Sequence, residues 1–319
     1  MKFIFKFFAL LKKNLSLIFV FIISVIGWAF FIFPFGDLSD LVGTKVAAFT
    51  QNQFFLQFSN IQLSVFPPGI KFHDMSVDTT MTGTIDAKEL TISPSPASLF
   101  SKVPAGNISA RGLFRGDVDI SLKPGTKSDT GIERQKIEIH AVHLSLQDLR
   151  ELGQIPLTMK GQLNVDGSVL TDLALAEQPE ADLLIKAEKF EFPSQTVNTM
   201  MGPINLPDLK VSALELKGHL SAGKLVIEEG NIGRENDELR GTIKGNLALN
   251  ILNQGGIQTQ MGAYSFDVDL TIKSTLEDRL SLFLVAISQF KSSVGDSSRY
   301  KFKVTGLNAF TPPSMSALH

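Results

Sequence analysis

The sequence predicts a mainly β protein, in which an N-terminal transmembrane helix precedes a long, curved antiparallel sheet. Three observations lead to this prediction. A single long apolar run without charges lies near the N-terminus. Beyond residue 50, apolar and polar residues alternate over many segments, which is typical of strands that bury one face. Glycine and proline clusters separate those segments. We therefore expect a half-barrel or incomplete barrel with two or three short helices.

The apolar run extends from Asn14 to Gly36, where 23 consecutive residues carry no charge. A helix needs roughly 20 apolar residues to cross a bilayer, so this run is long enough. No small-x-small cleavage site follows it, which favours an uncleaved signal anchor over a signal peptide. Four lysines and no acidic residue precede it, so the positive-inside rule keeps the N-terminus in the cytoplasm. A buried core helix is the alternative interpretation.

These features divide the chain into four parts. Residues 1–14 form a cytoplasmic lead, and residues 15–36 form a single-pass membrane anchor. Residues 37–310 form an exported β-rich domain, and residues 311–319 form a tail. Apolar residues at helical spacing between Leu38 and Phe49 predict a helix directly after the anchor. That helix either packs on the first strands or lies along the membrane surface.

The clearest strand pattern runs from Leu157 to Val169, and similar alternation occurs at 117–123, 242–251 and 266–273. Such alternation belongs to antiparallel sheets with one dry face. The phase slips by one residue between Ala141 and Val142, which predicts a β-bulge that bends the sheet.

A Lys-Gly-x-Leu motif recurs at Lys160, Lys217 and Lys244, each time inside a strand pattern. Glycine in a strand permits a kink or a close approach of neighbouring strands. Helical spacing is scarce in this part of the chain. We expect one helix at Leu276–Phe290 and a short one at Pro96–Ser101.

Composition excludes several classes of function. The chain has no cysteine, which excludes a thiol nucleophile, a thiolate zinc site and any disulfide. A net charge of -2 argues against a nucleic-acid partner. Fifteen of the 25 phenylalanines lie within residues 1–66, so much of the apolar character belongs to the anchor and the first strands.

The polar residues offer little chemistry. His140 and His143 form an HxxH pair, but residues three apart diverge on a strand, and no carboxylate lies beside them to complete a metal site. Two carboxylates share one strand face at 117 and 119, and two more at 267 and 269. We interpret them as the polar half of a strand rather than as an acid/base pair. No nucleotide-binding or hydrolase motif occurs. We expect no enzymatic activity, no cofactor and no metal.

The long apolar face of the sheet is the remaining candidate for function. Few helices are available to cover it, so part of it could form a groove for an acyl chain or a partner protein. Closure of the sheet around a filled core is the alternative. The candidate groove residues are Phe72, Phe114, Val118, Ile120, Leu163, Val165, Phe190, Phe192, Leu247, Leu249, Phe266 and Val268.

Five stretches of strand, turn and Gly/Pro pattern carry a family resemblance. They read FPFGDL at 33–38, FPPGIKF at 66–72, LTISPSPASLF at 90–100, ARGLFRGDV at 110–118 and GPINLP at 202–207. In this order, over roughly residues 25–270, the chain resembles the type II secretion system protein N (GspN) family, in its version with a full-length exported domain. The architecture is also similar to that of AsmA-type proteins.

The resemblance implies a protein of the bacterial inner membrane, with a cytoplasmic N-terminus and a periplasmic β-domain. It implies a non-enzymatic accessory role in type II protein secretion, with secretion-apparatus proteins as partners. Kinship with AsmA-type proteins would instead imply lipid binding or lipid transfer in outer-membrane maintenance, with phospholipid as the ligand. The family offers no catalytic residues, and the resemblance implies nothing for residues 274–319.

Overall fold

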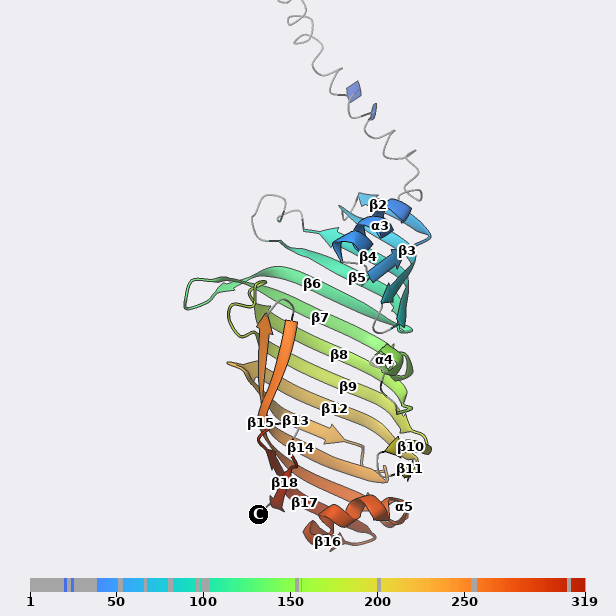
Figure 1. Cartoon of the computed structure of the whole chain (residues 1–319), viewed down its shortest axis with the longest axis vertical. Helices are drawn as coiled ribbons and strands as arrows, with labels where there is room; N and C mark the ends of the chain where they lie inside the picture. The colour runs from blue at the N-terminus through green and yellow to red at the C-terminus, as the bar shows by residue number, and fades with distance from the viewer. Residues whose placement is uncertain are drawn as a thin grey trace, which may run out of the picture.

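The computed structural model describes residues 20–21, 24–25, 39–50, 54–65, 68–79, 83–95, 98, 104–152, 155, 157–199, 202–253, 257–308 and 311–318. Within these residues the protein is mainly β, as the sequence predicts, and its strands stack into one long sheet (Figure 1). In chain order the strands are β1 (Phe54–Gln57), β2 (Asn60–Val65), β3 (Pro68–Thr79), β4 (Gly83–Pro94), β5 (Gly106–Leu113), β6 (Gly116–Lys127), β7 (Glu133–Ser145), β8 (Lys160–Thr171), β9 (Glu180–Phe192), β10 (Gln195–Thr199), β11 (Gly202–Leu206), β12 (Leu209–Ser221), β13 (Lys224–Ile232), β14 (Leu239–Asn253), β15 (Ile257–Lys273), β16 (Lys291–Val294), β17 (Ser297–Gly306) and β18 (Ser314–Ala317).

Sixteen of these strands form one antiparallel sheet. Its main path runs β1-β3-β4-β5-β6-β7-β8-β9-β12-β13-β14-β15-β17-β16, with β2 added on β3 and β18 on β17. The strands β10 and β11 form a separate hairpin between β9 and β12. Neighbours in the path are mostly consecutive in sequence, so short turns suffice to connect antiparallel strands.

Both edges of the sheet are built from short strands. At one edge, β1 and β2 pair with different halves of β3. At the other, β16 and β18 pair with different parts of β17. Short, broken edge strands limit uncontrolled association between sheets. Because the two edges do not pair with each other, the described strands form an open sheet and not a closed barrel.

Two neighbouring rows of apolar and glycine residues cross the sheet from edge to edge. Directly opposed residues of adjacent strands lie on one face, so the register defines each row. We call the two rows together the apolar strip. With fourteen strands about 4.8 Å apart, the strip is about 60 Å long. The first row is Ile61, Phe72, Leu90, Ala110, Val118, Ala141, Val165, Ile185, Leu216, Gly230, Ile243, Val268, Phe302 and Ala317, and the second is Leu63, Ile70, Ile92, Ile108, Ile120, Ile139, Gly167, Leu183, Gly218, Ile227, Gly245, Phe266, Val304 and Met315.

The bulge predicted after Ala141 is confirmed. The register of β7 against β8 shifts between Ala141 and Leu144, and His143 adopts a positive φ of 58°. Such a shift restores the apolar phase, because Leu144 again opposes an apolar residue, Leu163.

Each Lys-Gly-x-Leu motif also lies at a register shift. The first spans the shift between Lys160 and Gln162, and the second the shift between Lys217 and Gly218. At the third motif, two residues of β13 lie opposite a single residue of β14, so the pairing of these strands shifts there as well. A Cβ on Gly245 of that motif would lie 2.2 Å from the Ser265 carbonyl oxygen, so only glycine fits there. The repeated motif therefore marks bulges of the sheet.

Few helices accompany the sheet. Helix α3 (Ser39–Phe49) follows the anchor region, as expected. Helix α5 (Ser274–Leu284) continues as the 3-10 helix η3 (Val285–Phe290), which together cover the predicted helix at 276–290. The short helix expected at 96–101 lies mostly outside the described residues. Helix α4 (Leu146–Leu152) follows β7 directly, although Leu146 continues the alternation of Val142 and Leu144.

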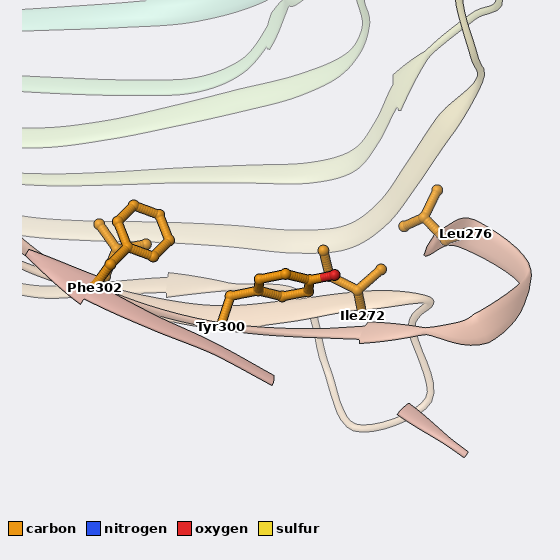
Figure 2. Packing of buried hydrophobic residues seen from close by; sticks show 5 residues of the cluster. Ile272, Leu276, Tyr300 and Phe302 are labelled. Atoms are coloured by element: carbon orange, nitrogen blue, oxygen red, sulfur yellow. The ribbon is translucent and has the colours of Figure 1, made fainter. Parts of the chain in front are cut away.

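The best-packed cluster lies where α5 and η3 cover the C-terminal end of the apolar face (Figure 2). Leu276 of α5 is fully buried, and Ile272 of β15 and Tyr300 of β17 are nearly so. Phe290 of η3 stacks on Phe302, with ring centroids 5.7 Å apart. These contacts cover the strip at Val268 and Phe302 with side chains of the same chain.

A polar contact supports this cluster. The Tyr300 hydroxyl donates a hydrogen bond of 2.8 Å to the Glu277 carboxylate, which also pairs with Lys291. Burial, followed by this hydrogen bond, raises the pKa of Tyr300 to about 12 from an ordinary value of 10.0. The neutral phenol is therefore favoured in the folded state. Its contribution to stability is complete below pH 10 and is lost as the pH rises through about 12.

We predict that this titration can be followed directly, because the chain has only two tyrosines. In the variant Tyr264→Phe, the ultraviolet absorbance of the phenolate should report Tyr300 alone, with a midpoint near 12. Adding Glu277→Gln should lower that midpoint while leaving it above 10, because burial remains the larger cause. A midpoint at 10 in folded Tyr264→Phe protein would contradict the prediction.

Most of the predicted anchor, residues 15–36, lies outside the described residues. Within it, residues 20–21 and 24–25 are helical, and the side chains of Val20, Phe21 and Val25 are exposed. Among the helices that the structure describes, none combines the length and the apolarity needed to cross a bilayer.

The C-terminal segment, expected as a tail, contains a strand. Residues 314–317 pair with β17 as β18.

Candidate functional site

The open part of the apolar strip is the candidate functional site. On β3, β4 and β5, three neighbouring isoleucines of the second row remain exposed: Ile70 by 38%, Ile92 by 38% and Ile108 by 41%. At the other end, by contrast, α5 and η3 bury Val268 and Phe302 of the first row. Contiguous exposed apolar surface on a folded protein is typical of a binding surface.

Half of the predicted groove residues lie in this strip. Phe72, Val118, Val165 and Val268 belong to its first row, and Ile120 and Phe266 to its second. Leu163 and Leu247 flank the strip on either side, opposite Ala187 and Leu225 respectively. The register thus brings these eight residues onto one face of the sheet.

The other four predicted groove residues lie elsewhere. Phe114 is in the turn between β5 and β6, with a positive φ of 49°, and does not belong to a strand face. Phe190 and Phe192 lie past the shift at Gly161, opposite Val211, which is buried, and Leu209, which is half-buried. Leu249 follows the register shift in the β14–β15 hairpin.

The distal half of the β14–β15 hairpin, residues 249–253 and 257–261, leaves the direction of the other strands, and we call it the arm. Figure 1 shows its two orange strands running across the ends of their neighbours. The Leu249 N–H donates to the Gly223 carbonyl at 2.8 Å. Further along, the Gln178 side chain donates to the Ile251 carbonyl at 3.1 Å and accepts from the Ile251 N–H at 3.0 Å. The arm therefore packs along the turns that join β12 to β13 and β8 to β9.

The opposite face of the sheet is polar and carries ion pairs between neighbouring strands. Lys123 and Lys136 lower the pKa of Glu138 to about 2. Arg299 forms two hydrogen bonds with Asp269, of 2.8 and 2.6 Å, and lowers the pKa of that carboxyl. Exposed pairs of this kind contribute little stability, but they keep this face hydrated. The further pairs are Arg111 with Asp117 and Asp119, His140 with Asp166, His219 with Asp182, Lys186 with Glu215, Lys217 with Glu228, Lys301 with Asp269 and Lys303 with Asp267.

The two histidines of the HxxH pair lie in different surroundings. Asp166 of β8 contacts the His140 ring, so a carboxylate does lie beside this histidine, contrary to the expectation from sequence. His143 sits at the bulge and uses its backbone N–H to bond Asn164 at 2.7 Å. In the part of the chain that the structure describes, no three acidic or histidine side chains converge as a metal site.

A hollow of about 800 Å³ runs from β5 to β13, lined by side chains of the polar face and by six residues of the second row. Its lining includes five carboxylates and one lysine, and each of these carboxylates is matched to a basic side chain by the pairs named above. The carboxylates of this hollow therefore lie in ion pairs or hydrogen-bonded pairs with neighbouring strands.

A comparison with family models gives one match. The family described as Type II secretion system protein GspN-like, Synergistales, matches residues 9–192. No curated protein and no solved structure matches the chain. The matched region contains the strands β1 to β9, which carry the open part of the strip. Since the match covers more than half of the sequence, the chain belongs to the GspN-like family of type II secretion system proteins.

Proposed function

We propose that this chain is a non-enzymatic accessory of type II secretion, anchored in the bacterial inner membrane with its β-sheet in the periplasm. The single observation that carries the proposal is the family match over residues 9–192. That match supports a role related to type II secretion and supports secretion-apparatus proteins as partners. The carboxylates of the polar face are paired with basic side chains, which is compatible with a non-enzymatic role.

The proposed anchor rests on the uncharged run from Asn14 to Gly36 and on the lysines before it. Exposed Val20, Phe21 and Val25 are compatible with a helix surrounded by lipid, because apolar side chains are stable there without protein neighbours. An anchor at this end of the chain would place the first strands nearest the membrane, and these strands carry the exposed isoleucines of the strip.

Deleting the gene should abolish or strongly reduce the release of type II secretion substrates into the medium, and the full chain should restore it. Extracellular hydrolase activity measures this, with outer-membrane permeability to a large dye as the control for leakage. Alkaline phosphatase fused after His319 should be active, since the C-terminus is then periplasmic. Unchanged secretion with an intact outer membrane would overturn the secretion role, and an inactive fusion would overturn the location.

A second candidate function is the AsmA-like binding or transfer of lipid. The observation that favours it is the length of the apolar strip, about 60 Å, together with its exposed isoleucines on β3–β5. Acyl chains bind without directional contacts, so a continuous apolar surface suffices for them. Co-purification of phospholipid with the full chain, measured by mass spectrometry, would support this function. A lipid-free preparation would contradict it.

A further inference from the structure

The C-terminal edge of the sheet is formed by two strands that differ in how they are attached. β17 pairs along its full length with β15 on one side. On its other side, residues 297–300 pair with β16 and residues 302–305 with β18. β16 is joined to β17 by a tight turn at Gly295 and Asp296, so it cannot leave without disrupting β17. β18 follows a seven-residue connection that contains Pro312 and Pro313, so it can leave and return.

Contacts hold β18 only weakly. All four of its residues are exposed, so its binding depends on backbone hydrogen bonds to four residues of β17. The net gain from such hydrogen bonds is comparable to the entropy lost when the strand is ordered. A longer or more apolar strand would pair with the same edge more favourably.

β18 itself indicates which strand this edge accepts. Ala317 opposes Phe302 and Met315 opposes Val304, so these two side chains extend both rows of the apolar strip. The alternate residues, Ser314 and Ser316, fall on the polar face, where Ser316 opposes Lys303. An occupant of this edge therefore needs apolar residues at alternate positions, with small polar or acidic residues between them.

Exposed apolar side chains lie along this edge. Leu307, directly after β17, is 76% exposed, and Met315 of β18 is 37% exposed. Val294 of β16, on the same edge, is exposed as well. A partner that pairs with β17 would bury part of this apolar surface, which β18 alone leaves in water.

We propose that β18 is an exchangeable edge strand, and that an extended segment of a partner protein, with apolar residues at alternate positions, replaces it on β17. The sheet and its apolar strip then continue into the partner. The assignment of this partner to the secretion apparatus rests on the proposed function, whereas the strand exchange rests on the edge alone.

The exchange can be tested with the full chain in detergent and a labelled peptide of residues 311–319 as the probe. The natural chain has no cysteine, so Val304→Cys with Met315→Cys forms a single disulfide that locks β18 on β17. We expect saturable peptide binding to the unlocked chain, loss of at least about tenfold in affinity when the lock is oxidised, and recovery on reduction. Val294→Cys with Ser297→Cys locks β16 instead and should leave binding unchanged.

A second peptide checks the chemistry of the occupant. Carrying M315D and A317D, it should bind at least about tenfold more weakly than the natural peptide, because two charges would enter the apolar rows. No binding to the unlocked chain, or equal binding to the locked chain, would overturn the proposal, and so would equal binding of the two peptides. Failure of the proposed secretion role can be told apart from failure of the strand exchange. If secretion survives gene deletion, the peptide-binding results still decide whether β18 exchanges.

Discussion

Replacing Leu276 with alanine should lower the free energy of unfolding by about 3 kcal/mol. Leu276 is fully buried between α5 and the strands β15 and β17, in the cluster with Ile272, Tyr300 and Phe302 (Figure 2). The variant loses the apolar burial of the leucine side chain and leaves a cavity between α5 and the strands. Urea denaturation followed by circular dichroism measures the change.

Leu282→Ala is the matched control for this prediction. It makes the same chemical change on the same helix, but Leu282 is 73% exposed, so the free energy of unfolding should change by no more than about 0.5 kcal/mol. Equal destabilisation by the two variants would contradict the assignment of Leu276 to a packed core.

Placing charges in the open part of the strip should abolish lipid binding. The double variant Ile92→Asp, Ile108→Asp puts two carboxylates on directly opposed positions of β4 and β5. Both isoleucines are exposed, so the fold should tolerate the change, whereas an acyl chain would have to bury charged groups. We expect co-purified phospholipid to fall by about tenfold or more, as measured by mass spectrometry. Secretion should fail in the deletion strain that carries this variant if the strip is the functional surface.

The control places the same charges on the same two strands but on the other face. Ser93 and Asn107 are directly opposed, one residue along from Ile92 and Ile108. The variant Ser93→Asp, Asn107→Asp should keep both lipid and secretion. Loss of both functions in the two variants alike would point to damage of the sheet and would contradict a role for the strip.

Local patterns predicted much of this fold. The slip after Ala141 predicted a bulge, and the stripe at 276–290 predicted the segment that became α5 and η3. Both predictions depend on the phase of neighbouring residues, which the sequence displays directly. The repeated Lys-Gly-x-Leu pattern marked further bulges, although sequence alone did not reveal that shared role.

Other features depend on contacts between distant residues and could not be read from local patterns. Leu146 continues the strand phase, yet α4 begins there. The arm is defined by the contacts of Ile251 with Gln178, 73 positions away. The sequence suggests that Phe114 belongs to a strand, but its positive φ places it in a turn. Among the candidate groove residues, six lie in the strip and Leu163 and Leu247 flank it, whereas the four at a turn or beyond a register shift lie elsewhere.

The order of the strands has a consequence for how this architecture varies in size. Each strand of the main path contacts essentially its two neighbours, and most neighbours are consecutive in the chain. Inserting or removing one hairpin would therefore preserve the direction and the facing of every other strand. Each added hairpin would lengthen the molecule by about 10 Å. The number of hairpins would therefore set the length of the sheet from one edge to the other.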